Sequence, residues 1–521
     1  MKRNTITSSA VLALSLLLPL AGEAKADPAA VYAENCASCH GEQRLGGIGP
    51  ALIPESLGRA KAEALAETIA NGRVQTQMPA FGDTLGGEEI AALVEYIRNP
   101  LGFDPVWGEA EIAASLLPNP DYTAANRPQF DADPMNLFVV VETGDHHATL
   151  LDGDTFTPIT RFPTRYALHG GPKYAPDGRY VYFMARDGWV TKYDIWSMQV
   201  VSEVRGGINS RNIALSKDGR HIALANYLPH SLVILSAEDL SVEKIFVATD
   251  AKGNTSRVSA VYQARPRDSF VVALKDVPEI WEIATDPDAA PVHEGFVHSH
   301  EKGMVEALAS SSGLFARRRI AVSEPLDDFF FSPDYRDLIG SSRAGDAGIV
   351  VNMNVGREIA RIPLPGLPHL GSGISWMWNG RRVMATPHLK EAKISIIDMD
   401  DWSVVKTLET LGPGFFMRSH DGTRYAWTDV FFGPNKDAMH VIDKSTLEIV
   451  KTLRPAPGKT AAHVEFDKDG RHALVSIWED DGALIVYDAE TLEEVKRIPM
   501  RKPSGKYNVW NKINFEDGTS H

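Results

Sequence analysis

The only two cysteines in this chain of 521 residues stand next to a histidine, in the segment Cys36-Ala37-Ser38-Cys39-His40. Two thiols at this C-x-x-C-H spacing can form thioethers to both vinyl groups of a haem, and the adjacent imidazole can bind its iron. A redox C-x-x-C pair or half of a zinc site would use the same cysteines. Neither alternative explains the histidine. The motif therefore predicts covalent haem c, attached through Cys36 and Cys39 and ligated by His40.

Met78 offers a sixth ligand for that iron, in the segment Gln77–Phe81 with the sequence Gln-Met-Pro-Ala-Phe. A thioether ligand raises the haem potential into an electron-transfer range, although methionines also fill gaps in protein cores. The Met-Pro pair is typical of the ligand loop of small class I cytochromes c, which favours ligation. Helices are predicted on both sides, over Ala29–Asn35 and over Gly87–Arg98, where apolar residues recur at helical spacing.

The first residues have the pattern of a signal peptide. Lys2 and Arg3 form a basic start, Val11–Ala21 is apolar, and Ala24–Ala26 has the A-x-A form of a cleavage site. The apolar run is too short to span a membrane, and no later run approaches that length. We therefore expect a protein exported to the periplasm, cleaved after Ala26, with no membrane span. Its net charge of −15 argues against nucleic acid as a partner.

One pattern recurs through most of the remaining chain: an apolar strand, an Asp-Gly turn, a second strand, a polar break, a third strand that often ends in Asp, and a fourth strand. The clearest copies of the turn with its second strand are Ala175–Phe183, Ser216–Leu224, His420–Trp427 and Phe466–Leu474. With weaker copies we count eight, about 40 to 50 residues apart, which is the period of a four-stranded propeller blade. The wide opening of such a propeller suits a flat ligand across the blade starts.

These patterns predict a small all-α class I cytochrome c domain followed by an all-β eight-bladed propeller. The expected boundaries are 1–26 for the signal peptide, 27–100 for the cytochrome c domain, 101–134 for a linker and 135–521 for the propeller. Within the linker, Trp107–Ile112 predicts a short helix that straps the two domains together. One interval between blades is long, so Pro287–Glu324, which contains the basic triplet Arg317–Arg319, is predicted to be an insertion.

A cytochrome c domain followed by an eight-bladed propeller resembles the cytochrome cd1 family, whose propeller holds a second, non-covalent haem d1. The resemblance covers nearly the whole mature chain and is most specific at Arg165–His169, Leu367–Gly373, Ala385–His388 and Pro503–Asn511. Within that family, Gln77–Phe81 and Trp107–Ile112 are most similar to the branch that oxidises dihydro-haem d1 during haem d1 biosynthesis.

The resemblance implies that His169 is the proximal ligand of the d1 iron and that His369 is its sixth ligand. Each histidine could instead be a structural residue of its loop. Nitrite reductases of the family keep a second distal histidine, which should fall within Glu324–Phe329. That segment of this chain contains carboxylates and no histidine. Because nitrite reduction consumes protons that a charged histidine pair supplies, the departure weakens the nitrite reductase interpretation.

His463 opens the last complete blade and is a plausible general base, since its ordinary pKa lies close to the working pH. Tyr507, in the tail strand, could orient the reacting side chain or assist His463. The carboxylates of a tetrapyrrole need cationic partners, and the candidates are Arg211, Arg257, Arg418 and, on the same face, His388. All of these residues could also be structural or belong to solvated rims.

The expected function is oxidation of a propionate of dihydro-haem d1 to the acrylate of haem d1. The tetrapyrrole would be substrate and product, and haem c would pass the electrons to a soluble carrier. The cd1 nitrite reductase is a possible further partner. Two alternatives remain open at this point: a cytochrome cd1 that reduces nitrite to nitric oxide, and a non-catalytic haem d1 carrier or electron-transfer protein.

Overall fold

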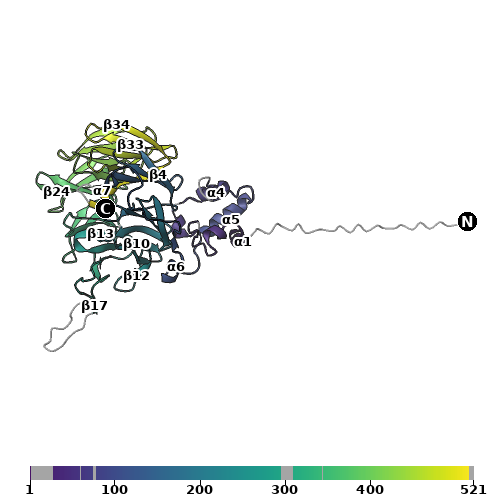
Figure 1. Ribbon diagram of the computed structural model, residues 1–521. Coiled ribbons are helices and arrows are strands. Elements are labelled where there is room, and N and C mark those ends of the chain that lie inside the picture. The colour runs from purple at the N-terminus through teal and green to yellow at the C-terminus, as the bar shows by residue number, and fades with distance from the viewer. Residues whose placement is uncertain are drawn as a thin grey trace, which may run out of the picture.

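The computed structural model describes residue 1 and residues 27–47, 49–58, 60–73, 78–294, 309–342 and 344–514. Apart from Met1, the predicted signal peptide lies outside the described residues, and so does Gln77 of the predicted ligand loop. A group of short helices comes first in the described chain, and a ring of β-sheets follows it, as Figure 1 shows.

The helices of the amino-terminal group are α1 (Pro28–Asn35), α2 (Ala37–His40), α3 (Pro54–Leu57), α4 (Ala62–Asn71) and α5 (Gly87–Arg98). Asp27 caps α1, because its side chain accepts a hydrogen bond from the Ala29 amide at 3.1 Å. The apolar stripe predicted for α5 is buried at all four positions: Ile90, Leu93, Val94 and Ile97. This stripe packs with α1 and α4 into one small core.

Eight antiparallel sheets in the described chain form the blades of the ring. Blade 1 contains β35 (Pro503–Asn508), β2 (Leu137–Glu142), β3 (His147–Asp152) and β4 (Pro158–Pro163). Blade 2 contains β5 (Lys173–Tyr174), β6 (Tyr180–Met184), β7 (Trp189–Asp194), β8 (Gln199–Arg205) and an added outer strand, β1 (Leu117–Pro118). Blade 3 contains β9 (Asn209–Leu215), β10 (His221–Leu228), β11 (Ser231–Ser236) and β12 (Val242–Val247). Blade 4 contains β13 (Val258–Ala264), β14 (Ser269–Leu274), β15 (Glu279–Ala284) and β18 (Arg317–Ala321).

The second half of the ring has the same plan. Blade 5 contains β19 (Leu326–Phe331), β20 (Asp337–Ser342), β21 (Ala347–Asn352) and β22 (Arg357–Pro363). Blade 6 contains β23 (Ile374–Trp378), β24 (Arg381–Pro387), β25 (Lys393–Asp398) and β26 (Val404–Glu409). Blade 7 contains β27 (Met417–Ser419), β28 (Tyr425–Asp429), β29 (Met439–Asp443) and β30 (Glu448–Leu453). Blade 8 contains β31 (Ala461–Phe466), β32 (His472–Ile477), β33 (Gly482–Asp488) and β34 (Glu494–Met500).

The last strand of the chain closes the ring. β35 pairs antiparallel with β2, so Tyr507 lies opposite Val139, and the helix α7 (Val509–Asn514) follows. Closure leaves no exposed inner edge between the first and last blades. Because the blades follow one another around the ring in chain order, blade 2 and blade 6 lie opposite each other, with three blades between them on either side.

The Asp-Gly turns that revealed the repeat join the first and second strands of a blade. Gly178 and Gly219 both have φ of 74° in these turns. Glycine adopts this left-handed backbone without the steric cost that a Cβ atom would bring. The turn chemistry therefore marks the blades in the sequence, and the blade count predicted from it is confirmed.

The structure corrects the predicted insertion in blade 4. Arg317–Arg319 lie in β18, the outermost strand of that blade, and pair with β15. The described part of the extra segment forms a hairpin of β16 (Val292–Glu294) and β17 (Ala309–Ser311). Short 3-10 helices occur at η1 (Pro134–Asn136), η2 (Arg265–Arg267) and η3 (Leu370–Ser372).

The linker straps the cytochrome domain to blade 2, as predicted. Its helix α6 (Glu109–Ala114) begins two residues later than expected. Ile112 is fully buried among apolar residues of blades 2 and 3, and the indole Nε1 of Trp107 donates to the Arg205 carbonyl at 2.8 Å. The guanidinium of Arg205 lies 4.6 Å from the centre of the same indole ring.

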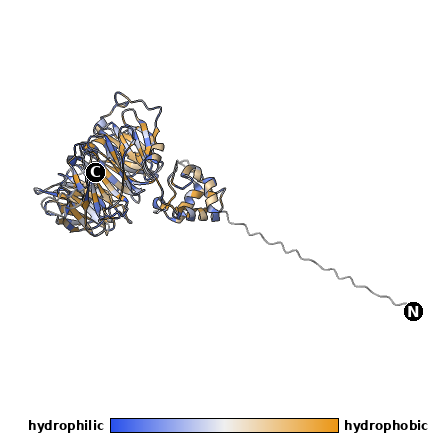
Figure 2. Cartoon of the chain, turned by 90° about the horizontal axis from the view of Figure 1, so that it is seen from below, coloured by the Kyte–Doolittle hydropathy of each residue, from blue (hydrophilic) through white to orange (hydrophobic). Residues whose placement is uncertain are grey.

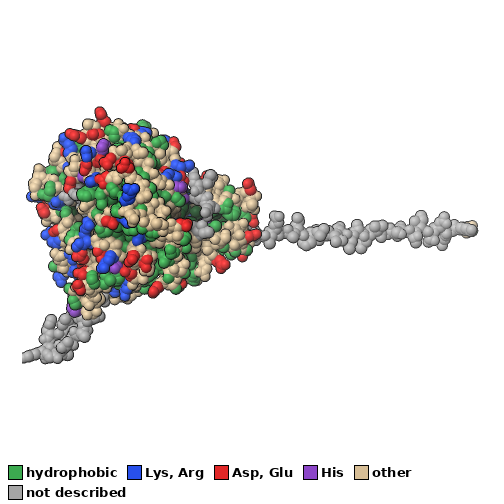
Figure 3. Space-filling model, viewed as in Figure 1, with side chains coloured by type: hydrophobic (Ala, Val, Ile, Leu, Met, Phe, Trp, Pro, Cys, Tyr) green, Lys and Arg blue, Asp and Glu red, His purple; other side chains and the backbone are tan. Residues whose placement is uncertain are grey.

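Hydropathy follows this architecture. Apolar residues run along the strands inside the blades in Figure 2, and acidic and basic side chains are interspersed over the face of the molecule in Figure 3. Among the described residues, none of the helices combines the length and the apolar character that crossing a membrane requires.

Candidate active site

The C-x-x-C-H motif forms a single helical turn. Cys36 caps the start of α2 and Cys39 lies within it, and the two form no disulfide with each other. The Nδ1 atom of His40 lies 2.8 Å from the Pro50 carbonyl oxygen. Because a carbonyl can only accept, Nδ1 carries the proton and Nε2 keeps a lone pair for iron. A Cβ atom on Gly49 would come within 2.6 Å of this imidazole, so glycine is required there. The donor set fits haem c.

Met78 is described, but its predicted ligand loop is not complete, since residues 74–77 lie outside the described chain. The Met78 carbonyl accepts from the Arg73 amide at 3.0 Å, which brings the two ends of the loop together. Ligation of the haem c iron by Met78 stays a prediction.

The helical domain contacts the propeller at blades 2 and 3. The side-chain amide of Asn209 donates to the Glu55 carbonyl at 2.9 Å, and Ile53 packs with Ile208 in a shared apolar cluster. Asn209 begins β9, and His169 lies just before β5 of the neighbouring blade. The haem c domain therefore sits on the side of the ring that carries His169.

His169 has the same tautomer as His40. Its Nδ1 lies 2.7 Å from the Arg211 carbonyl oxygen, so Nδ1 donates and Nε2 has the lone pair. Two guanidinium groups reach that lone pair: Nη2 of Arg186 and Nη1 of Arg211 each lie 3.0 Å from Nε2. His169 also lines a pocket together with Tyr507. The lone pair that iron would take is thus hydrogen-bonded to Arg186 and Arg211.

His369 repeats this arrangement in blade 6. Its Nδ1 lies 2.6 Å from the Phe415 carbonyl oxygen and 2.8 Å from the Ser372 hydroxyl. Its Nε2 lies 3.8 Å from a carboxylate oxygen of Asp328. Burial lowers the pKa of His369, although the Asp328 charge opposes this shift. A neutral imidazole with its lone pair on Nε2 is the form that binds iron.

Asp328 stands in the segment where a second distal histidine would be expected. The Tyr262 hydroxyl donates to it at 2.8 Å and the Gly371 amide at 3.0 Å. Asp327 lies farther from the site and pairs with Lys275. The position beside His369 is therefore occupied by a buried carboxylate, which cannot donate a proton while it is ionised.

His463 lies in the same site from blade 8. Its ring centre is 5.2 Å from that of Tyr507 and 4.7 Å from that of Phe416. In the part of the chain that the structure describes, no hydrogen-bond partner reaches its Nδ1. Burial, reinforced by the charges of Lys506 and Arg418, lowers the pKa of His463 well below its usual value. The imidazole is neutral and can accept a proton.

Two glycines make room for the Tyr507 ring. A Cβ atom on Gly171 would come within 2.9 Å of the ring, and one on Gly505 within 2.5 Å of the hydroxyl oxygen. Gly171 also has φ of 68°. Burial raises the pKa of Tyr507 to about 12, so the phenol stays protonated. The ring is held beside His463 and His169.

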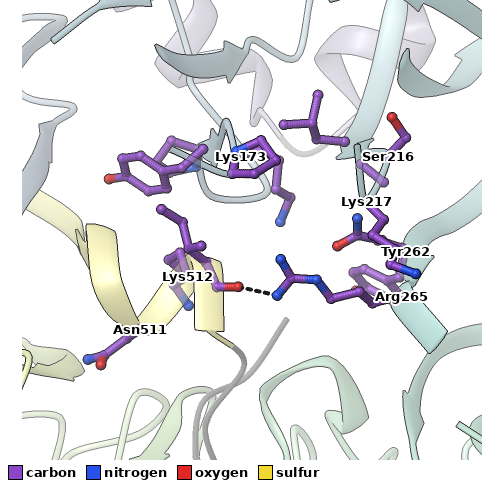
Figure 4. A pocket seen from close by; sticks show the side chains of 14 residues that line it. Lys173, Ser216, Lys217, Tyr262, Arg265, Asn511 and Lys512 are labelled. Carbon is purple, nitrogen blue, oxygen red and sulfur yellow. Dashed lines mark hydrogen bonds between the residues drawn. The ribbon is translucent and has the colours of Figure 1, made fainter. Parts of the chain in front are cut away.

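A second pocket lies at the far ends of the innermost strands, where α7 meets blades 2 to 4 (Figure 4). Its open volume is about 630 Å³ when solvent at its mouth is counted. The basic residues that line it are Lys173, Lys217, Arg265 and Lys512. Burial, together with the charge of Arg418, lowers the pKa of Lys173 to about 8 and that of Lys512 to about 7.

Arg418 connects this pocket to the site of His463, because its charge affects His463, Lys173 and Lys512 alike. It is 6% exposed, and its Nε and Nη1 atoms have no hydrogen-bond partner within the described residues. Glu465 is the nearby carboxylate, 3.7 Å from Nε of Arg418 and 3.6 Å from Nζ of Lys512. The cluster has more cations than carboxylates, which suits an anionic ligand.

Two predicted residues lie apart from this group. Arg257 forms a two-pronged ion pair with Asp276, and both side chains are about one-third exposed. His388 is fully buried, and its ring nitrogens lie 2.7 Å from the Pro365 carbonyl oxygen and 2.9 Å from the Ser395 hydroxyl. Both nitrogens of His388 are therefore engaged within and beside its own blade. The geometry gives no support to a role for His388 in cofactor binding.

Sequence reasoning missed several residues of the site: Lys173, Arg186, Asp429, Glu465, Lys506 and Lys512. Arg186 follows β6, Asp429 ends β28 and Lys512 lies in α7. The others, Lys173, Glu465 and Lys506, lie in innermost strands, where apolar spacing carries no sign of them. One signal was available. Lys506 stands next to Tyr507 in the tail segment Pro503–Asn511, on which the family resemblance rests, and Lys512 follows that segment directly.

These features define the class of the protein: a c-type cytochrome domain joined to a propeller whose channel suits a second tetrapyrrole. The profile of the cytochrome D1 heme domain matches residues 132–291 and 288–512. That of the cbb3-type cytochrome c oxidase subunit III matches residues 23–97. The chain belongs to the cytochrome D1 heme domain family.

Individual relatives agree with this assignment. A dihydro-heme d1 dehydrogenase of Pseudomonas aeruginosa is 54% identical over 98% of this chain and 99% of its own length. A nitrite reductase of Stutzerimonas stutzeri is 25% identical over 93% of this chain and 92% of its own. The solved structure of the dihydro-heme d1 dehydrogenase NirN in complex with DHE has a TM-score of 0.86 and 54% identity, covering 94% of this chain and all of that one.

Proposed function

We propose that this chain oxidises a propionate side chain of dihydro-haem d1 to the acrylate of haem d1 and passes the electrons to haem c. The chain is an oxidoreductase, and its full-length similarity to a dihydro-heme d1 dehydrogenase supports this substrate. One structural observation carries the proposal. The neutral, buried imidazole of His463 packs against the ring of Tyr507, which lines the pocket of His169.

The reaction removes one hydrogen from each of two adjacent carbons. Two C–H bonds break, one C=C bond forms, and two protons and two electrons leave the side chain. The tetrapyrrole with its iron, together with haem c, supplies the electron-accepting chemistry. His463 would take one proton on its imidazole, and the other would pass to solvent through the channel. Its low pKa makes His463 a weak base, and a substrate carboxylate nearby would raise that pKa toward the working pH.

His169 and His369 would hold the iron of the tetrapyrrole, since each donates from Nδ1 to a backbone carbonyl and keeps a lone pair on Nε2. The two histidines lie in opposite blades. Arg186 and Arg211, which reach the Nε2 lone pair of His169, would be free to pair with carboxylates of the ligand once iron took that place.

The cluster of Arg418, Lys512 and Lys173 would receive carboxylates of the ligand. Arg418 is the best-placed donor, because its Nε and Nη1 have no hydrogen-bond partner among the described residues and its carboxylate neighbour Glu465 stands 3.7 Å from Nε. Tyr507 contributes a protonated hydroxyl next to His463. These contacts hold the reacting side chain against the base, which is the positioning that an elimination of this kind requires.

Electrons would leave through the cytochrome domain, which contacts the propeller on the side of the ring that carries His169. A haem c that His40 and Met78 ligate has a potential suited to electron transfer. A soluble electron carrier then reoxidises haem c. The reaction takes place in the periplasm, where the signal pattern directs the chain, and the cd1 nitrite reductase of the same compartment is the natural recipient of the product.

Anaerobic mixing of the haem c protein, in its oxidised form, with dihydro-haem d1 tests the proposal. The pigment should change to the spectrum of haem d1 as haem c becomes reduced, and the extracted tetrapyrrole should be lighter by two hydrogens. Pigment that binds and returns unchanged would instead identify a carrier. Turnover of nitrite by the loaded protein would identify a nitrite reductase, an outcome that the carboxylate of Asp328 beside His369 argues against.

A further inference from the structure

His463 lies in a β-bulge of strand β31, which sets the direction of its side chain. The pairing of β31 with β32 slips between Ala462 and Val464, so His463 is the extra residue of the bulge. Its φ is 52°, in the left-handed region that few residues with a side chain adopt. A bulge takes the backbone groups of its extra residue out of the strand ladder. Because His463 is 3% exposed, those groups need other partners.

Two buried charged side chains supply those partners. The His463 amide donates to Oδ2 of Asp429 at 3.2 Å. The Nζ of Lys506 donates to the His463 carbonyl and also lies 3.0 Å from the Ser476 hydroxyl. Asp429 is 1% exposed and Lys506 is fully buried. One comes from blade 7 and the other from the closing strand β35, so the bulge is held from both neighbouring blades.

Asp429 has a second set of contacts, on the other side of the site. Its Oδ1 accepts from the Phe415 amide at 2.7 Å and from the Phe416 amide at 3.1 Å. The Phe415 carbonyl is the acceptor that fixes the tautomer of His369. The Phe415 ring also lies 4.3 Å from the His369 ring, between centres. One carboxylate is thus hydrogen-bonded to the backbone that carries the base and to the backbone that orients the iron ligand.

We propose that Asp429 is a positioning residue that fixes His463 and His369 relative to each other, while Lys506 positions His463 alone. This inference rests on the proposed function and deepens it. In a dehydrogenation the hydrogen must lie within reach of the base while the iron is held by its ligand. Side chains that are prearranged by a second layer of hydrogen bonds achieve this without reorganisation. A displacement of the base by about 1 Å costs on the order of 100-fold in rate.

The two residues therefore predict different effects. Asp429→Ala removes both sets of contacts, so the spectrum of the bound d1 pigment and the conversion rate should both change. Lys506→Met leaves the contacts of Phe415 and Phe416 intact. It should lower the conversion rate by about 100-fold and leave the spectrum and ligand field of the bound iron as in the unchanged protein. Asp429→Asn keeps one oxygen acceptor and should fall between the two.

Asp443→Asn is the matched control. Asp443 is buried at the opposite end of the same blade and also accepts from backbone amides, those of Ser445 at 2.8 Å and Thr446 at 3.3 Å. Its replacement disturbs the fold of blade 7 without touching His369 or His463. It should leave both the spectrum and the rate unchanged.

The measurements are optical and electron paramagnetic spectra of the full-length haem c protein with bound dihydro-haem d1, followed by single-turnover conversion. If the unsubstituted protein converts no pigment, the proposed function is wrong. The spectra of the Asp429 variants then still test whether Asp429 positions His369. If conversion proceeds and Asp429→Ala and Asp429→Asn alter neither readout, the positioning role is wrong. It is also wrong if Lys506→Met changes the iron spectrum as much as Asp429→Ala, because that pattern indicates general disorder. Where Asp429→Ala fails to fold, Asp429→Asn and Lys506→Met decide the matter.

Discussion

His169 and His369 lie in opposite blades, and each donates its Nδ1–H to a backbone carbonyl of the next blade along the chain. The acceptors are Arg211 of blade 3, at 2.7 Å, and Phe415, just before the first strand of blade 7, at 2.6 Å. His40 makes the same kind of bond to Pro50. All three histidines that we predict as iron ligands therefore present Nε2 as the lone pair. Histidines that ligate metals have this second hydrogen bond in common, because it fixes both tautomer and ring orientation.

Replacement of His369 by Ala should open one axial position of the d1 iron while His169 still holds the other. We expect the pigment to bind and its iron to change from a low-spin to a high-spin spectrum, measured by optical and electron paramagnetic spectroscopy. His388→Gln is the matched control in the same blade, and it should leave the spectrum alone. An unchanged spectrum in His369→Ala would remove His369 from the coordination sphere.

Replacement of His463 by Gln should leave d1 binding intact and slow the conversion by about 10²- to 10⁴-fold, the usual contribution of a general base. Glutamine keeps a similar polar volume but cannot accept the proton. The measurement is single-turnover absorbance under anaerobic conditions. His440→Gln, which changes a buried histidine elsewhere in the ring, should convert pigment at the normal rate. Normal conversion by His463→Gln would exclude His463 as the base.

The haem motif and the blade repeats could be predicted because their signals are local. Cys36, Cys39 and His40 are adjacent in sequence, and each Asp-Gly turn lies between the two strands that it joins. His169, His369 and His463 could be placed at blade starts for the same reason. Local patterns predicted the position of each histidine along its blade. The family resemblance supplied its role as an iron ligand or a base.

The supporting residues could not be predicted in this way. Asp429 lies 34 residues from His463 in sequence and Lys506 lies 43 residues away. Packing of neighbouring blades brings Asp429 to His463, and closure of the ring by β35 brings Lys506 there. The contacts of His388 could not be predicted for a related reason. The sequence placed it on the face of the other candidates, but whether its nitrogens face the channel or a neighbouring loop depends on packing that the strand pattern does not contain, and a role in cofactor binding stays a prediction.

Acid stability should depend on His440. Its Nε2 accepts from the Leu411 amide at 3.1 Å, and burial, with the Arg454 charge, lowers its pKa from 6.5 to about 4. The unfolded chain then binds more protons than the folded one between these values. Stability is therefore complete above about pH 6.5 and falls as the pH drops toward 4, by at most about 3 kcal/mol from this group.

His440→Gln removes that titration. Urea unfolding followed by tryptophan fluorescence should show a smaller loss of unfolding free energy between pH 7 and about pH 4.5 than in the unchanged protein. If the unfolding free energy falls equally with pH in both proteins, other titrating groups determine the loss of stability in acid.

Met78→Ala should lower the reduction potential of haem c, because a thioether ligand favours the reduced iron. Redox titration of the cytochrome absorbance measures the shift. Met135→Ala, a change of a methionine in the propeller, should leave the potential in place. A potential that does not move in Met78→Ala would mean that another group is the sixth ligand.

Binding of the carboxylated tetrapyrrole should take up protons, and Lys512 is the main reason. Burial, with the Arg418 charge, lowers the pKa of Lys512 to about 7, and a bound carboxylate would raise that pKa by favouring the charged form. Affinity should therefore be highest below about pH 7. It should fall as the pH rises, by up to about tenfold per pH unit for one linked proton. Titrations of d1 pigment at several pH values measure this slope.

Lys512→Met should weaken binding of the d1 pigment at pH 7 and make its affinity less dependent on pH. Lys217→Met is the control, since Lys217 lines the same pocket but is nearly half exposed and already paired with Asp268 at 2.8 Å. The affinity of the Lys217→Met variant should fall with pH as steeply as that of the unchanged protein. If the affinity of the Lys512 variant still falls with pH as steeply as before, the carboxylates of the ligand do not reach this end of the channel, and Arg211 and Arg186 beside His169 must bind them instead.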